Sequence, residues 1–118
     1  MDKEETWYGA EDNCKKSNGH LASIVNRNEQ RHLEKFLEDS TGFWIGLKSL
    51  IGEISWVDGS KNLMQEYLDG VSGTASRNSM SNCARFVEGK WKFDAHCDSR
   101  RMYVCKYRGE CTCMFFSL

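Results

Sequence analysis

Six cysteines in 118 residues are the feature that most constrains the fold of this chain. An even cysteine count in a small domain favours disulfides and an oxidising compartment. Four of the cysteines bracket a tryptophan-containing centre, namely Cys14, Cys83, Cys97 and Cys105. No Cys-x-x-Cys pair is present, which argues against zinc-binding and thioredoxin-like interpretations. We therefore expect one disulfide-stabilised extracellular domain that spans residues 1–118.

Two apolar segments form the predicted centre of the core. Phe43–Leu47 is a short run without charge, as expected for a strand that is buried on both faces. Trp56 and Val57 begin a second apolar element, which Asp58-Gly59 closes with a turn. The chain is long enough to bury a core, and its four tryptophans, six phenylalanines and four tyrosines supply the bulk for one.

The flanking pattern predicts two helices, and hence an α+β domain. The first helix follows Thr6, which can cap it, and ends at Asn18-Gly19. Its apolar face consists of Trp7, Ala10 and Cys14. The second helix begins at Asn26, and Glu29 three residues later resembles a capping box. Its apolar stripe consists of Leu33, Phe36 and Leu37.

Short apolar segments predict several strands. They cover residues 20–25, 83–87, 90–93 and 101–107. The second and third of these strands are expected to form a hairpin across Glu88-Gly89. Residues 71–79 are small, polar and without period, which is typical of a functional or disordered loop.

The charge balance argues against two classes of partner. The net charge is −1 and the isoelectric point is about 6.3, so we expect no nucleic-acid partner and no attraction to a membrane surface. No segment approaches the ~20 apolar residues that span a bilayer, and no signal-peptide run follows Met1. We expect a piece of an exported protein, either a cell-surface ectodomain or a secreted domain. No Asn-x-Ser/Thr sequon is present, so N-glycosylation is not expected.

Several motifs occur together in one order. They are Thr6-Trp7, Gly19–Ile24, Trp44–Leu47, Trp56–Ser60 and Tyr103–Lys106, with the four bracketing cysteines between and around them. In this order, residues 6–107 resemble C-type-lectin-like domains. The resemblance implies two helices flanking two small antiparallel sheets, with a long loop as the ligand-binding region. It also implies the disulfides Cys14–Cys105 and Cys83–Cys97. In the chain-entropy model the first is worth roughly 4 to 5 kcal/mol and the second about 3 kcal/mol.

The C-terminal tail departs from the family pattern. Members of this family begin with a strand of the type Cys-aromatic-x-Phe, and Cys113–Ser117 resembles that strand at the other end of the chain. In the family the first and last strands lie side by side and antiparallel. We hypothesise a circular permutation, natural or designed, in which residues 108–118 hold the relocated first strand and fold back on residues 101–107. The alternative is a non-native or alternatively spliced tail.

Two cysteines in the tail have no evident partner. Cys111 and Cys113 would share one face of an extended strand, too far apart for a disulfide. They could be free, paired with a cysteine outside this chain, or bonded between chains. A metal site with His96 would have only three ligands, which is a weak signal, so we expect no metal and no cofactor.

The residues expected at a calcium site are mostly replaced. Calcium-dependent lectins of this family use a Glu-Pro-Asn or Gln-Pro-Asp triplet in the long loop and a Trp-Asn-Asp triplet later. Here the first position holds Val71-Ser72-Gly73, the chain contains no proline, and the second position holds Lys92-Phe93-Asp94. Calcium needs about six to eight oxygen ligands, and one carboxylate cannot supply them. The same departures occur in the natural-killer-cell-receptor-like branch, which mostly binds proteins and sometimes glycans.

The candidate ligand-binding residues cluster in the second half of the chain. They are Tyr67, Arg77, Arg85, Lys90, Trp91, Lys92, Asp94 and Arg100. The basic run from Lys90 to Arg101 could recognise an acidic protein or a sulfated glycan, or it could be a solvated strand edge that nearby acidic residues neutralise. Trp91 belongs either to the core or to a binding hot spot, and Tyr67 either anchors its loop or meets a partner.

These observations favour a recognition module. The first hypothesis is a receptor domain that binds a protein ligand without the usual calcium site, with homodimerisation left open. The second is a glycan-binding lectin that is independent of calcium, and the third is a scaffold whose permuted ends are its purpose. Catalysis is not expected, because the three histidines lie in separate elements and no nucleophile motif is present.

Overall fold

A computed structural model of the chain describes residues 4–36, 42–50, 53–69, 81–94, 96–108 and 114–117. The helices in these ranges are α1 (Trp7–Lys16), α2 (Arg27–Phe36) and the 3-10 turn η1 (Gln65–Tyr67). The strands are β1 (Gly19–Leu21), β2 (Phe43–Leu50), β3 (Glu53–Trp56), β4 (Leu68–Asp69), β5 (Ser81–Val87), β6 (Lys90–Asp94), β7 (Cys105–Arg108) and β8 (Met114–Ser117). The expected α+β class is confirmed.

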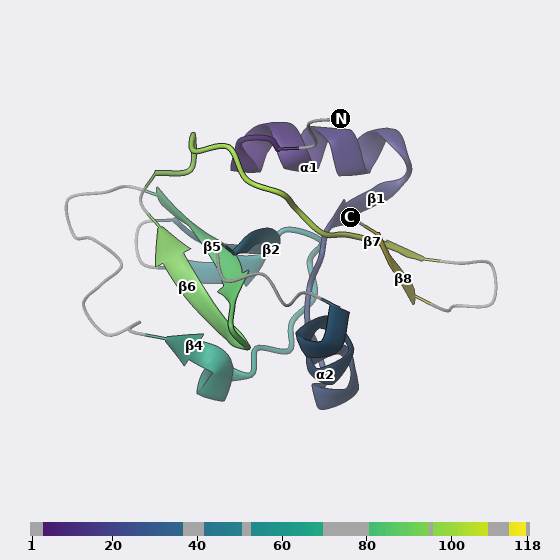
Figure 1. Cartoon of the computed structure of the whole chain (residues 1–118), viewed down its shortest axis with the longest axis vertical. Helices are drawn as coiled ribbons and strands as arrows, with labels where there is room; N and C mark the ends of the chain where they lie inside the picture. Colours follow the sequence, from purple (N-terminus) through teal and green to yellow (C-terminus); the bar gives the residue numbers. More distant parts are fainter. Residues whose placement is uncertain are drawn as a thin grey trace.

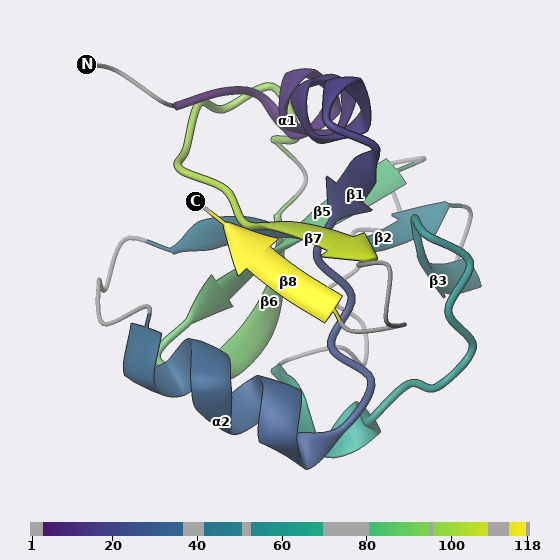
Figure 2. The same cartoon turned by 90° about the vertical axis from the view of Figure 1, so that its right-hand side faces the viewer.

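The strands form two sheets between the two helices. One sheet has the order β1-β7-β8 and the other the order β3-β2-β5-β6-β4. All pairings between neighbouring strands are antiparallel except that of β4 with β6. In both views α1 and α2 lie at opposite ends of the molecule (Figures 1 and 2). In the described ranges no helix is both long and apolar enough to cross a bilayer.

Helix α1 begins where its sequence predicts. Thr6 Oγ1 accepts a hydrogen bond from the Gly9 N–H at 3.0 Å, and the three residues of the predicted apolar face are buried. The end of the helix differs in one detail. Asn18 rather than Gly19 adopts the positive φ, at 67°, because Gly19 already belongs to β1. A short polar side chain tolerates this left-handed conformation.

Helix α2 is capped in a variant of the expected box. Asn26 Oδ1 accepts from the Glu29 N–H at 2.8 Å, and Glu29 Oε1 accepts from the Val25 N–H at 2.9 Å. The return bond therefore reaches one residue further back than in the usual capping box. Of the predicted apolar stripe, Leu33 is fully buried. Leu37 lies outside the described residues, and so does the side chain of Phe36.

Strand β2 has apolar clusters on both of its faces, as Phe43–Leu47 predicts. Ile45 and Leu47 belong to a cluster with Trp56 and Trp91, and Trp44 belongs to a second cluster with the side chains of α1. Trp7 Nε1 donates to the Ile45 carbonyl at 2.8 Å, which ties α1 to this strand. Burying one such aromatic or aliphatic side chain contributes roughly 1.5–3 kcal/mol.

Gly46 is required by a close backbone approach. Its N–H donates to the Ala22 carbonyl at 2.7 Å, and its carbonyl accepts from the Val57 N–H at 2.7 Å. A Cβ at this position would lie 2.4 Å from the Leu21 carbonyl oxygen. Any larger residue would push apart the chain segments that join the two sheets.

Several predicted strand boundaries need correction. Trp56 ends β3 rather than beginning an element, and the turn follows it. The expected strand over residues 20–25 is shorter, at Gly19–Leu21, because the following backbone crosses to β2 and to the Val104 segment. The expected strand over residues 101–107 is regular only from Cys105, and isolated bridges precede it. The hairpin across Glu88-Gly89 is confirmed, and both turn residues have positive φ.

Both implied disulfides are present. Cys14 and Cys105 join α1 to β7 with their Cα atoms 5.6 Å apart, and Cys83 and Cys97 join β5 to the loop that follows β6 with a separation of 5.5 Å. Cys111 and Cys113 lie outside the described residues.

The predicted return of the C-terminal tail is confirmed. Strand β8 pairs antiparallel with β7, from Cys105 opposite Ser117 to Arg108 opposite Met114. Figure 2 shows β8 crossing in front of the molecule beside β7. The pairing itself does not test the hypothesis of a circular permutation.

Candidate ligand-binding face

The β5–β6 hairpin carries most of the predicted ligand-binding residues. Its register places Arg85 opposite Lys92 and Val87 opposite Lys90. Because strand residues alternate between faces, these three cations share the face opposite to the Trp91 side of the sheet. We call Arg85, Lys90 and Lys92 the basic face. Arg85 and Lys92 are half-buried and Lys90 is exposed.

Trp91 belongs to the core, so its interpretation as an exposed hot spot is wrong. Its side chain is fully buried, and Nε1 donates to Gln30 Oε1 at 3.0 Å. Its ring packs edge-on against Trp56, with ring centroids 5.1 Å apart. Gln30 is also buried, and its Nε2 donates to the Gly89 carbonyl at 2.8 Å. Trp91 therefore connects β6 to α2 through Gln30.

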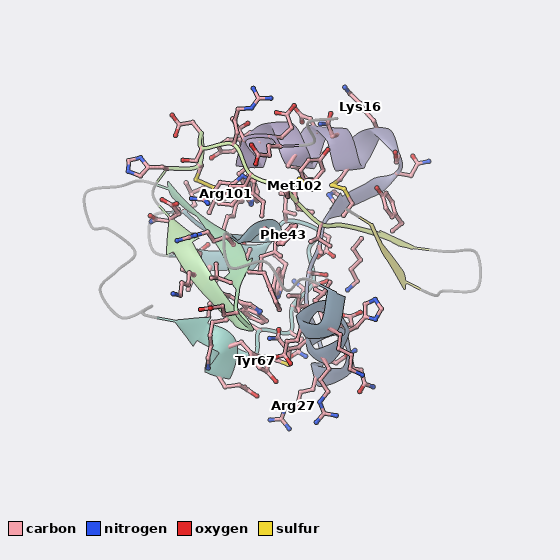
Figure 3. All side chains as sticks on the ribbon, viewed as in Figure 1. Lys16, Arg27, Phe43, Tyr67, Arg101 and Met102 are labelled. Atoms are coloured by element: carbon pink, nitrogen blue, oxygen red, sulfur yellow. A yellow bond between two sulfur atoms is a disulfide. The ribbon has the colours of Figure 1, made fainter. Side chains whose placement is uncertain are left out.

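Tyr67 anchors its loop, which is one of the two roles that the sequence allows. Its ring lies 5.6 Å from that of Trp91 between centroids, and its side chain is partly buried against the core. Figure 3 shows Tyr67 near the α2 end of the sheet and Arg101 near the α1 end. Any ligand contact of Tyr67 would use only the exposed part of its ring.

Asp94 is engaged within the protein. Its Oδ2 lies 3.0 Å from Arg101 Nη2, and its Oδ1 accepts from the His96 N–H at 2.9 Å. The Arg101 guanidinium lies over the Trp44 ring, 5.3 Å from the centroid. This cation–π contact holds the positive charge beside Asp94. Arg101 is a residue of this site that sequence reasoning did not select.

The described residues do not fit a calcium ion at the Lys92–Asp94 position. Both Asp94 oxygens already have partners, and Lys92 adds positive charge next to them. Asn82, which stands just before Cys83, is buried, and its Oδ1 accepts no hydrogen bond in the part of the chain that the structure describes. Within that same part no three His, Cys, Asp or Glu side chains are grouped as metal ligands. Residues 71–73 lie outside it.

The remaining candidates do not join the basic face. Arg100 is exposed, and its Nη2 donates to the Glu4 carbonyl at 3.2 Å, so it lies toward the chain start beside α1. Arg77 lies outside the described residues. His96 is exposed on the loop after β6, and the two tail cysteines that were weighed with it as metal ligands are not described.

A partly buried polar network fixes the segment that leads from β3 toward η1. Asp58 Oδ2 accepts from Ser23 Oγ at 2.6 Å, and Asp58 Oδ1 accepts from the Ser60 N–H at 2.8 Å. Burial raises the pKa of the Asp58 carboxyl, but the hydrogen bonds from Ser23 and Ser60 and the charge of Lys106 outweigh it, so this pKa lies below its ordinary value. Asp58 is therefore an ionised anchor at neutral pH.

The chain belongs to the C-type lectin domain family. The family profile described as "Lectin C-type domain" matches residues 3–107. The human protein "C-type lectin domain family 4 member K" is 32% identical over 111 residues, which cover 86% of this chain and 33% of that protein. Human "Lymphocyte antigen 75" is 36% identical over 99 residues, which cover 80% of this chain and 5% of that protein. The chain thus spans a third or less of the length of these relatives.

Solved structures show the same fold. The carbohydrate-recognition domain of the mouse scavenger receptor C-type lectin superposes with a TM-score of 0.74 at 25% identity, covering 86% of this chain and 82% of that one. The carbohydrate-recognition domain of cow CD23, solved in the presence of a GlcNAc2Man3 oligosaccharide, gives 0.71 at 28% identity, covering 88% and 81%. A calcium-independent type II antifreeze protein gives 0.72 at 25% identity, covering 87% and 78%.

Proposed function

We propose that this domain binds a protein ligand without a calcium ion, through the surface around the β5–β6 hairpin. The single observation that carries the proposal is the Asp94–Arg101 ion pair. An arginine of the same chain supplies the positive charge next to Asp94, where a calcium-dependent lectin would place its metal. The basic face adjoins this pair on β6. The surface therefore carries its own positive charge for binding a partner and needs no metal ion.

The burial of Trp91 favours a protein ligand over a glycan. Lectins often stack a sugar ring on an exposed aromatic side chain, but Trp91 is enclosed in the core and Tyr67 packs against it. The basic face offers charged groups on a strand surface, which suits the polar rim of a protein interface. Glycan binding without calcium is the second candidate, because the cow CD23 domain was solved in the presence of an oligosaccharide.

The setting of this function follows from the disulfides and the family. Two disulfides suit an oxidising compartment, so we place the domain outside the cell as part of a receptor or a secreted protein. The departures at residues 71–73 and 92–94 place it, in our proposal, nearest to the natural-killer-cell-receptor-like branch. The domain acts by recognition rather than catalysis. Sedimentation equilibrium of the isolated domain determines whether it is a homodimer.

A glycan array in calcium and again in chelator tests this proposal. The sample is the folded domain, with Lys92→Glu as the test variant and Lys16→Glu on α1 as the matched control. Binding that chelator abolishes would overturn the proposal. Binding that persists in chelator and weakens only in Lys92→Glu would establish the glycan alternative. We expect no signal on the glycan array. We expect instead that the domain captures a cell-surface protein, that chelator leaves this capture unchanged, and that only Lys92→Glu weakens it.

A further inference from the structure

The exposed side of α2 carries a row of positive charge that the proposed function does not use. Arg27, Arg31 and Lys35 follow one another at intervals of four residues along this helix, and all three are exposed. Residues four apart lie about 6 Å apart along a helix axis and only about 40° apart around it, so the three cations form one row about 12 Å long. We call these three residues the α2 stripe. Figure 3 shows Arg27 at the α2 end of the molecule, away from the sheets.

The opposite side of α2 is fixed against the domain, which keeps the stripe turned outward. Leu33 and Gln30 are fully buried. Gln30 Nε2 donates to the Gly89 carbonyl at 2.8 Å, and its Oε1 accepts from Trp91 Nε1 at 3.0 Å. These contacts hold the helix at one rotation about its axis. A ligand therefore meets the three cations in a preformed row, which lowers the entropic cost of binding.

The carboxylates of α2 are held by other partners. Glu29 Oε2 lies 3.1 Å from the buried Lys106 ammonium. Glu34 Oε2 accepts from Gln30 Nε2 at 2.9 Å and lies beside Gly89, so this side chain is drawn toward the β5–β6 turn. Both negative charges are thus directed to the domain and not to the outward row.

Two of the three cations have no partner of opposite charge in the part of the chain that the structure describes. Arg31 and Lys35 take part in no ion pair there. Arg27 pairs with Glu66 of η1, with 2.9 Å between Nη2 and Oε2, but the Arg27 side chain is 70% exposed. An exposed pair of this kind contributes little and leaves other guanidinium donors available. The stripe is therefore a local concentration of positive charge in a chain whose net charge is −1.

The stripe offers charge without an apolar anchor among the described side chains. The large hydrophobic side chains that are exposed in the described ranges are Tyr8 on α1 and Leu50 at the end of β2, and neither lies on α2. Protein interfaces bury an apolar centre inside a polar rim. A row of exposed cations without such a centre instead suits a ligand whose negative charges repeat along a chain.

We propose that the α2 stripe is a second binding site, which takes a sulfated glycan chain. Sulfate has the tetrahedral shape of phosphate, and a guanidinium group binds such oxyanions through two parallel hydrogen bonds. The sulfates of a linear glycan recur along the chain, so one chain reaches all three cations at once. This glycan is the polyanion that fits the extracellular setting proposed above.

The α2 site is independent of the basic face and needs no calcium ion. It recognises charge along a chain rather than a single sugar. Unsulfated glycans lack this charge, so their behaviour on an array does not report on α2.

Heparin fragments of defined length test the site on a biosensor surface, in chelator and at about 0.15 M salt. The test variant is Arg31→Glu with Lys35→Glu. The matched control, Lys15→Glu with Lys16→Glu, makes the same charge change at the end of α1. We expect at least about tenfold weaker binding in the test variant and less than about twofold in the control. The affinity of the test variant should also depend less steeply on salt, because fewer counterions are released on binding.

Three further measurements keep the proposal open to refutation. Melting temperatures establish that each variant is folded, and Arg31→Lys, which keeps the charge, should bind nearly as well as the parent. Equal losses in the two double variants would overturn the proposal, because only the total charge would then matter. No heparin binding by the parent domain would overturn it as well.

A second probe and a second variant identify the ligand class and the surface. A polyglutamate peptide is measured beside heparin, and the test variant should lose heparin binding selectively. Equal losses with both probes would mean that an acidic protein segment fits the stripe as well as a glycan, and the assignment to a glycan would fail. A loss of heparin binding confined to Lys90→Glu with Lys92→Glu would move the glycan to the basic face and refute the site on α2.

Discussion

The Lys106 ammonium lies 3.1 Å from both carboxylate oxygens of Glu29, which joins β7 to α2 inside the domain. The Lys106 side chain is 2% exposed and that of Glu29 is 15% exposed. The same ammonium donates to Ser23 Oγ at 3.1 Å, so it also reaches the hydroxyl that bonds to Asp58. A buried lysine with this many partners holds three chain segments in one arrangement.

Removing the charge of Glu29 should destabilise the domain strongly. Glu29→Gln removes the carboxylate that lies 3.1 Å from the buried Lys106 ammonium, and we expect a loss of about 3 kcal/mol in the free energy of unfolding. Urea denaturation at pH 7 measures it. The control is Glu66→Gln, which breaks the exposed Arg27–Glu66 pair and should change stability little. Similar losses in both variants would contradict the role of the buried pair.

The fall in the stability of the domain at acid pH should depend on Asp58. The pKa of this carboxyl is lowered in the folded state, so its ionised form stabilises the domain above its unfolded pKa of about 3.9. That contribution is lost as the pH falls through the folded pKa. Asp58→Asn should therefore be less stable than the parent at pH 7, and the difference should shrink as the pH falls from 5 toward 2. Urea midpoints across about pH 2–7 measure this, and a difference that is constant with pH would refute it.

Trp91 should matter for stability and not for ligand contact. Trp91→Phe removes the donor to Gln30 Oε1 and part of the packing against Trp56, so we expect a loss of about 1–3 kcal/mol. Binding measured per folded molecule should be unchanged. Tyr8→Ala on α1 is the control, because Tyr8 is 52% exposed and its loss should affect stability less. Weaker ligand binding by a folded Trp91→Phe domain would contradict this prediction, because it would show that Trp91 contributes to the ligand-binding surface.

The two disulfides should contribute unequally to stability. The Cys14–Cys105 bridge spans 91 residues and the Cys83–Cys97 bridge spans 14. In the chain-entropy model their removal costs roughly 4–5 and about 3 kcal/mol. Paired Cys→Ala substitutions, compared by urea denaturation, should therefore destabilise more at the first bridge. The reverse order would show that packing around Cys83 outweighs loop length.

Local sequence patterns predicted the parts of the fold that local chemistry determines. Thr6 and Asn26 cap helices because their side chains reach nearby backbone donors, and Phe43–Leu47 packs on both faces because it has no charged residue. Strand limits were less predictable. The short β1 and the late start of β7 depend on backbone contacts with segments far away along the chain.

The candidate site was predictable only in part. The sequence placed Lys90 and Lys92 in one basic run, but it could not decide whether Trp91 lay inside or outside. Arg101 was named in the basic run but not selected as a candidate, because it reaches Asp94 through an irregular loop whose path no local pattern gives. Lys106 was missed as a buried residue because lysine is usually exposed, and its burial depends on Glu29 and Ser23, which lie far from it in sequence.

The basic face should bind anionic partners because of where its cations lie, and not only through the total charge of the domain. The double variant Lys90→Glu and Lys92→Glu reverses two positive charges that lie two residues apart on the same face of β6. The control double variant, Lys15→Glu and Lys16→Glu, makes the same charge change at the end of α1. The probe is a polyglutamate peptide on a biosensor surface at low salt, where such contacts are least screened. We expect about tenfold weaker binding in the first variant and a smaller change in the second. Melting temperatures confirm that both variants are folded. Equal losses would mean that the face is an ordinary solvated strand surface, because only the total charge would then matter.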